Sequence, residues 1–165
     1  MEVRIFKLQS PKLQIEILNY GGVIKSIKTP DKNDNFENIV LEYEDINLYK
    51  SNSNYFGALI GRTSGRIYNG EFTLNNEKYT LVKNDNKHHL HGGTTGYNKV
   101  FWEVLDYTDD RILLSYTSKD GEEGYPGNLE IEVEYRIENE DELVVEYKAV
   151  TDKDTIVNLT NHAYF

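Results

Sequence analysis

Residues 131–150 read IEVEYRIENEDELVVEYKAV, and this stretch decides the fold. Apolar side chains occupy every second position of residues 131–137, and charged side chains fill the positions between them. The alternation returns in Leu143–Val150 after the polar run ENEDE. Because successive side chains of a strand point to opposite faces, each run predicts a strand with one buried face and one wet face.

The same period of two extends outward from this stretch to the rest of the chain. Leu13, Ile15 and Ile17 alternate with polar residues and predict another strand. Further strands are predicted at Val3–Leu8, Val23–Thr29, Asn38–Tyr43, Glu71–Leu74, Lys78–Val82, Phe101–Tyr107, Ile112–Ser118 and Thr155–Leu159. Many short strands with frequent turns indicate an all-β, antiparallel sandwich or barrel, and not a doubly wound sheet.

Turn residues separate the predicted strands. Asn69-Gly70 and Asn75-Asn76 stand in short connections between apolar runs, which favours hairpins. Only Asp45–Lys50 has the pattern of a helical turn. We find no internal repeat and no low-complexity linker, so we expect residues 1–165 to form part of one domain.

Composition excludes several classes of function. The 165 residues include thirteen Tyr and six Phe, too much buriable aromatic surface for a disordered chain. There is no Cys, which excludes disulfides, Cys-ligated zinc and a Cys nucleophile. The net charge of −10 argues against a nucleic-acid partner, because an acidic surface repels phosphates. We find no signal peptide and no membrane-spanning run, and we therefore predict a cytoplasmic protein without membrane partners.

Three of the four histidines lie together in HHLHGG, residues 88–93. A zinc site is one interpretation, because imidazole is a common zinc ligand, but the nearby carboxylates show no ligand spacing. For His88 and His89 the sequence favours solvated loop residues. His91 differs because Gly92-Gly93 follows it, and two glycines permit unusual backbone angles and the close approach of another group. A functional residue and a turn cap both remain open for His91.

The fourth histidine, His162, lies among Asn, Thr and Tyr near the end of the chain. A lone histidine of this kind is more often a core residue with its hydrogen bonds satisfied than a catalytic one. The chain then ends on Tyr164 and Phe165, whereas natural ends are usually polar and exposed. We therefore expect an interrupted, truncated fold.

Two other segments carry charged residues in turns. Arg62 and Arg66 are bracketed by glycines in GRTSGRI, residues 61–67, which suggests a bend that presents a guanidinium group. A phosphate loop is excluded by the glycine spacing, and a surface salt bridge is the simpler interpretation of Arg62. The acidic loop Asp120–Gly127 lacks the spacing of an EF-hand, so a solvated turn is favoured over a calcium site.

Six segments in order resemble the aldose 1-epimerase (galactose mutarotase) family. They are NYGG (19–22), YFGA (55–58), GRTSGRI (61–67), LHGG (90–93) with Gly96 and Trp102, DGEEGYPGN (120–128) and NLTNHAYF (158–165). The resemblance covers the N-terminal half of a typical member, so the C-terminal half is expected to be absent from this chain. It implies an antiparallel β-sandwich of the galactose mutarotase type with a cleft for an aldohexose, and no metal or other cofactor.

The resemblance also implies roles for particular residues. His162 is similar to the family's general acid, and His91 to its substrate-positioning histidine. Arg66 corresponds to an arginine that binds sugar hydroxyls, and Tyr164 lies in the motif of the general acid. Gly65 stands where many members have Asn, which implies one missing substrate contact. Ala163 replaces a common Ser, with little consequence expected.

The general base is what the sequence lacks. In the family a Glu of the C-terminal half removes the anomeric proton, and no Glu here matches its motif. We therefore expect the 165-residue chain to be nearly inactive alone, and to self-associate or to bind a C-terminal half. Two alternatives remain open: a non-catalytic carbohydrate-binding protein, and an epimerase of phosphorylated hexoses, for which the acidic charge is unfavourable.

Overall fold

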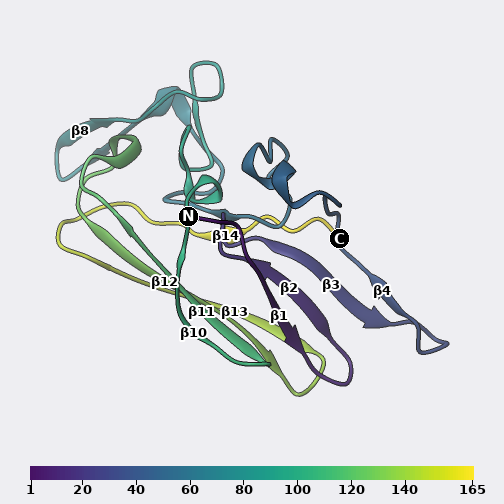
Figure 1. Cartoon of the computed structure of the whole chain (residues 1–165). Helices are drawn as coiled ribbons and strands as arrows, with labels where there is room; N and C mark the ends of the chain where they lie inside the picture. The colour runs from purple at the N-terminus through teal and green to yellow at the C-terminus, as the bar shows by residue number, and fades with distance from the viewer.

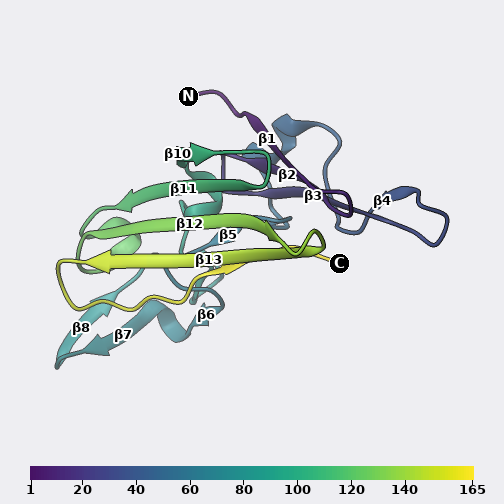
Figure 2. The ribbon, with the colours of Figure 1, turned by 90° about the horizontal axis from the view of Figure 1, so that it is seen from below.

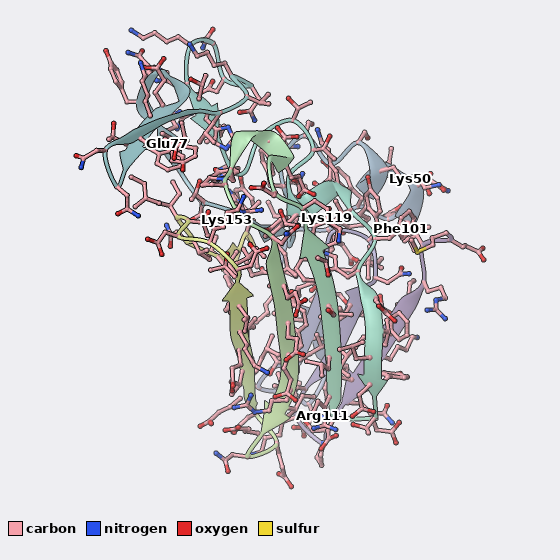
Figure 3. The ribbon with its side chains drawn as sticks, turned by 90° about the vertical axis from the view of Figure 1, so that its left-hand side faces the viewer. Lys50, Glu77, Phe101, Arg111, Lys119 and Lys153 are labelled. Atoms are coloured by element: carbon pink, nitrogen blue, oxygen red, sulfur yellow. The ribbon has the colours of Figure 1, made fainter.

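The structure, a computed structural model, describes residues 1–165 and is built around two facing four-stranded antiparallel sheets (Figure 1). The first sheet has the order β1-β2-β3-β4, from Ile5–Gln9, Gln14–Leu18, Ile24–Pro30 and Phe36–Asn38. The second has the order β10-β11-β12-β13, from Glu103–Tyr107, Arg111–Ser118, Leu129–Glu138 and Glu142–Thr151. Figure 3 shows the second sheet in front of the first. The predicted all-β sandwich is confirmed.

The stretch that alternates most regularly forms the longest ladder. Strands β12 and β13 pair over ten residues each without a shift in register. Leu129, Ile131, Val133 and Tyr135 are each at most 1% exposed, whereas Glu130 between them is exposed. Burying four large side chains from one strand face contributes roughly 1.5–3 kcal/mol for each of them before entropy is counted. The alternation therefore places β12 at the centre of the core.

The sandwich is closed along one side. The Tyr107 hydroxyl donates to the Lys7 carbonyl at 2.9 Å, and the Gln9 amide donates to the Asp109 carbonyl at 2.7 Å. These bonds join strand β1 to β10 and the turn that follows it. The 16-residue core lies between the sheets and includes Trp102, which is 2% exposed. On the other side, β4 and β13 are the outer strands of their sheets.

Two predicted strands are wrong. Instead of Asn38–Tyr43, strand β4 ends at Asn38, because the Asn38 side chain takes over the ladder's hydrogen bonds: its Oδ1 accepts from the Ile27 amide and its Nδ2 donates to the Val40 carbonyl. Residues 155–159 form no regular strand. Asn158 joins these residues to the segment after Gly61, because its amide donates to the Arg62 carbonyl at 3.0 Å.

Of the two predicted hairpin turns, one is confirmed and one is wrong. Asn75-Asn76 forms the predicted two-residue hairpin, with φ values of 51° and 63° between strands β7 and β8, Glu71–Leu74 and Glu77–Thr80. Asn69-Gly70 does not form a hairpin, because β6, Arg66–Ile67, pairs with β9, His89–Leu90, and not with β7.

Short 3-10 turns and ladders gather at one end of the sandwich, opposite the end marked by Arg111 in Figure 3. The predicted helical turn is confirmed as η1, where the Asp45 side chain accepts from the Asn47 amide at 2.9 Å. The 3-10 turns are η1 Ile46–Lys50, η2 Tyr68–Gly70, η3 Tyr97–Lys99 and η4 Glu122–Gly124. Two more strands, β5 Leu59–Ile60 and β14 Thr160–Asn161, pair with each other.

Figure 2 shows the β7–β8 hairpin extending away from the second sheet. No helix in the chain has the length and apolar character needed to cross a membrane.

Candidate functional site

His91 is held beside Gly65 by two hydrogen bonds. The His91 amide donates to the Gly65 carbonyl at 3.0 Å, and the Gly65 amide donates to His91 Nδ1 at 3.1 Å. An Nδ1 that accepts a hydrogen bond carries no proton, so this imidazole is neutral with its proton on Nε2. Burial lowers the pKa of His91, and the nearby charges of His162 and Arg66 lower it further.

The two glycines after His91 allow the close approach that the sequence predicted. Gly92 has a φ of 84°, and a Cβ placed there would lie 1.5 Å from the Gly61 carbonyl oxygen. Gly93 has a φ of 103°, and its Cβ would lie 2.1 Å from a Glu123 carboxylate oxygen. Only glycine fits either position. His91 itself has a φ of 52°, in the left-handed region.

His162 comes to the same place from the other side of the site. Its amide donates to the Ala58 carbonyl at 2.8 Å, and its carbonyl accepts from the Gly57 amide at 3.1 Å. Asn161 shapes the turn, because its Oδ1 accepts from the Ala163 amide at 2.9 Å and its Nδ2 donates to the Gly57 carbonyl at 2.7 Å. The ring centroids of His91 and His162 are 5.2 Å apart, with the rings nearly perpendicular.

The ring nitrogens of His162 make no hydrogen bond within the chain, and they are not fully buried. They are therefore open to a ligand or water, unlike Nδ1 of His91. Tyr164 packs its ring 4.9 Å from that of His162 and 5.3 Å from that of Phe56, and its own side chain is partly exposed. The structure thus brings Tyr164 to the site as well.

Arg66 reaches the site through the β6–β9 ladder, where it pairs with Leu90, the residue before His91. The Arg66 side chain is 62% exposed, and its Nε lies 2.6 Å from Asp85 Oδ2. The ion pair orients the guanidinium group through one nitrogen, and no hydrogen bond within the chain occupies the other two. Those nitrogens are donors that a hydroxyl-rich ligand can use.

Tyr55 belongs to the same cluster, and sequence reasoning missed it. Its ring lies 5.0 Å from that of His91 and 5.7 Å from that of His162, nearly parallel to the latter. The YFGA segment that contains Tyr55 contributed to the family resemblance, but nothing in the segment assigned it a role. Its φ of 59° is the signal that a structure supplies and a sequence does not.

The prediction that His89 is a solvated loop residue is wrong. His89 is fully buried, its Nδ1 donates to the Val82 carbonyl at 2.6 Å, and the Tyr125 hydroxyl donates to its Nε2 at 2.6 Å. The Thr63 hydroxyl in turn bonds to that of Tyr125 at 2.5 Å. Both ring nitrogens are therefore engaged, and neither is free to join His91 on a zinc ion. Burial lowers the pKa of His89 and keeps it neutral.

The interpretation of Arg62 as a surface salt bridge is also wrong. Arg62 is 1% exposed and makes no ion pair with a carboxylate. It donates to the carbonyls of Pro126 and Gly127 at 2.8 and 3.0 Å and to the Ser118 hydroxyl at 2.7 Å. A buried guanidinium with oxygen acceptors on several segments joins the Gly61 segment to the acidic loop and to β11.

The acidic loop is likewise more than a solvated turn. The Glu123 carboxylate accepts from the Thr94 and Thr95 amides at 3.0 and 2.7 Å, and its backbone carbonyl accepts from Val82 at 3.0 Å. The loop therefore clamps the segment that follows His91. The sequence does not indicate this contact, because nothing in the spacing of the two segments predicts that they meet. Only the folded loop reveals it.

The chain is similar to known proteins over almost its whole length. A family model described as aldose 1-epimerase matches residues 4–165. The chain belongs to the aldose 1-epimerase family. Relatives include a galactose mutarotase from Bos taurus, 39% identical over 163 residues, and an aldose 1-epimerase from Haemophilus influenzae, 35% identical over 153 residues. These matches cover 99% and 93% of this chain but 47% and 44% of the relatives, so the chain spans about half their length.

Solved structures agree with this placement in the aldose 1-epimerase family. A GalM/aldose epimerase homologue from C. elegans superimposes with a TM-score of 0.94 at 27% identity, over 99% of this chain and 50% of that protein. A galactose 1-epimerase from Lactobacillus acidophilus gives a TM-score of 0.83 at 28% identity, over 100% and 53%. The sandwich therefore has the fold of the aldose 1-epimerase family, and the resemblance to the N-terminal half of its members is confirmed.

Proposed function

We propose that this chain supplies the acid and substrate-positioning part of an aldose 1-epimerase site acting on aldohexoses such as galactose or glucose. The observation that carries the proposal is the meeting of His91, His162 and Arg66 in one cluster. The two histidines come from separate loops and Arg66 comes from strand β6, so only the folded chain brings them together. The names of the relatives support the substrate class.

Interconversion of anomers requires opening the sugar ring. A base removes the proton of the anomeric hydroxyl while an acid protonates the ring oxygen, and the C1–O5 bond breaks. Rotation about C1–C2 presents the other face of the carbonyl. The ring then closes as the O5 hydroxyl returns its proton to the acid and the base returns its proton to the C1 oxygen, which inverts C1. The acid must hold a proton and release it near neutral pH, which suits histidine.

The two histidines are suited to different parts of this reaction. Nδ1 of His91 accepts a hydrogen bond from the Gly65 amide. His91 therefore remains neutral and offers Nε2–H as a fixed donor to a sugar hydroxyl. His162 has both ring nitrogens free of protein partners and can carry the transferred proton. Arg66 offers further donors at the exposed edge. We assign the proton transfer to His162 and positioning to His91, Arg66 and Tyr164.

The base is proposed to come from the C-terminal half of the family's length. Two carboxylates near the segments that carry His91 and Arg66 are engaged in other contacts: Asp85 pairs with Arg66, and Glu123 accepts from two backbone amides. A carboxylate held by strong donors is a weak base. The 165-residue chain alone is therefore expected to catalyse little mutarotation.

Polarimetry tests both assignments. Freshly dissolved α-D-galactose should equilibrate at nearly the buffer rate with this chain, and clearly faster with a chimaera that joins it to the C-terminal half of the bovine relative. In the chimaera, His162→Ala should lower the rate about 10²–10⁴-fold. The matched control His88→Ala should not. Turnover by the chain alone would refute the missing base, and survival of activity in His162→Ala within a few-fold would refute the acid.

We also propose where the C-terminal half binds. An apolar groove of about 360 Å³ lies between the two sheets on their open side, and Ile24, Ile27, Leu143 and Val145 line it. Strand β13 beside it is an outer strand over its whole length, with unpaired backbone groups on one edge. An added strand would satisfy that edge and cover the groove.

Sedimentation tests this partner. Alone, the chain should self-associate through the open edge, and an equimolar C-terminal half of the bovine relative should convert it to a 1:1 complex. Leu143→Asp should weaken that complex, whereas Leu105→Asp, an exposed leucine on β10, should not. A 19.2 kDa monomer that ignores the added half would refute the proposal.

A further inference from the structure

Tyr55 completes a three-ring cluster with the two histidines. Its centroid lies within 6 Å of both imidazoles, edge-on to His91 and nearly parallel to His162. The rings therefore contact one another in a closed triangle, since His91 and His162 also touch. Removing the Tyr55 ring would leave a space beside both imidazoles.

The chain holds Tyr55 in this place against its backbone preference. A left-handed φ of 59° is unfavourable for a bulky residue and persists only where the surroundings fix it. Asn52, which is 2% exposed, fixes it here. Its carbonyl accepts from the Tyr55 amide at 3.1 Å, and its side chain bonds both the amide and the carbonyl of Phe56. Gly57 and Ala58, the next residues, bond directly to the backbone of His162.

The Tyr55 hydroxyl is free. It has no hydrogen-bond partner in the chain and it is not fully buried, so it is open to solvent. Burial of the ring raises the pKa of Tyr55, and the negative charge of Asp85 raises it further. The hydroxyl therefore stays protonated at neutral pH and acts as a donor near the Arg66–Asp85 pair.

We infer that Tyr55 has two functions in the proposed sugar site: its ring keeps His91 and His162 in their mutual arrangement, and its hydroxyl donates a hydrogen bond to a hydroxyl of the bound aldohexose. The inference rests on the proposed function. A rigid aromatic ring with a polar tip suits such a ligand, which has apolar C–H faces and a rim of hydroxyls. Tyr55 is thus a ligand-binding and positioning residue, not a proton carrier.

The test uses the 165-residue chain and its four imidazoles, followed by ¹H–¹³C NMR of the Cε1–H groups during titration with D-galactose. The ring-less polyol galactitol serves as the control ligand. In the wild type, galactose should shift the His91 and His162 resonances and galactitol should not. Tyr55→Phe should leave both ligand-free resonances in place. It should weaken galactose binding about five- to tenfold, because one hydrogen bond is lost.

Tyr55→Leu should in addition move the ligand-free His91 and His162 resonances, because it removes the ring that packs on them. Tyr79→Phe, which removes an exposed hydroxyl on β8, should change neither reading. Equal galactose affinity in wild type and Tyr55→Phe refutes the hydroxyl function, and unmoved imidazole resonances in Tyr55→Leu refute the ring function. A wild type that does not respond to galactose refutes the sugar site itself, a result distinct from both.

Discussion

Arg62 should be far more important for stability than Arg66, although both sit in the same short motif. In Arg62→Met the side chain keeps an apolar stem of similar length but loses the guanidinium group. Three acceptors at 3.0 Å or less would lose their donor in a buried place: the carbonyls of Pro126 and Gly127 and the hydroxyl of Ser118.

The magnitude follows from those three bonds. Leaving a buried acceptor without a partner costs about 1–3 kcal/mol, and the donor here is charged, which strengthens each bond. The variant no longer has to bury a charge, which offsets part of the loss. We therefore expect the free energy of unfolding to fall by about 3–5 kcal/mol. With a urea m-value of about 2 kcal/mol/M, the midpoint should fall by about 1.5–2.5 M.

Urea unfolding followed by fluorescence of Trp102 measures this loss. Trp102 is the only tryptophan and is 2% exposed, so its emission reports the core. The matched control is Arg66→Met, where an exposed ion pair to Asp85 is worth at most about 1 kcal/mol. Arg62→Lys keeps the charge with fewer donors and should fall between the two. A midpoint for Arg62→Met equal to that of Arg66→Met would refute the anchoring role.

Other substitutions probe the segment around His91. Gly92→Ala and Gly121→Ala both place a Cβ at a φ of 84°, but only at Gly92 does it meet an atom, the Gly61 carbonyl oxygen. In urea unfolding, the free energy of unfolding should fall by about 1–2 kcal/mol for Gly121→Ala and by at least about 2 kcal/mol more for Gly92→Ala. Equal losses would contradict the steric argument. The pKa of His91 is lowered in the fold, so the unfolded chain takes up its proton first, and this contribution to stability declines as the pH falls below about 6.5. NMR titration should give a midpoint below that value, and a midpoint above it would contradict the buried, neutral state. Gly65→Asn should be tolerated within about 1 kcal/mol, because Asn accepts a left-handed φ and the added Cβ meets nothing within 4 Å, and it should tighten galactose binding a few-fold by NMR. Unchanged binding would show that no contact is missing there.

The sheets could be predicted from the sequence because their information is local. Alternation in residues 131–137 places β12 correctly, and the polar run after it marks the turn to β13. The strand predicted at Asn38–Tyr43 failed for a reason that alternation does not carry. The Asn38 side chain replaces a backbone partner, and its competition with the ladder depends on where β3 lies.

The site was predictable only in part, because its contacts join distant segments. Gly92-Gly93 indicated a close approach near His91, and the motifs indicated His162. The sequence did not show what approaches: the Gly61 carbonyl and the Glu123 carboxylate come from other loops. Likewise, burial decides the roles of His89 and Arg62, and burial of a polar residue cannot be deduced from its neighbours in sequence.

The proposed division of labour between His91 and His162 follows from one backbone amide. To accept a proton at Nδ1, His91 would have to give up the hydrogen bond from Gly65, and that bond sits in a ladder that also positions Arg66. In the proposed reaction, protonation of His91 would therefore disturb the edge at which Arg66 is expected to bind the sugar. His162 is tied only through its backbone, to Gly57 and Ala58, so its ring can gain and lose a proton without breaking a bond within the chain. An acid that cycles between two charge states is best held by its main chain, and a donor that must stay fixed is best held by its ring. The fold applies the first arrangement to His162 and the second to His91.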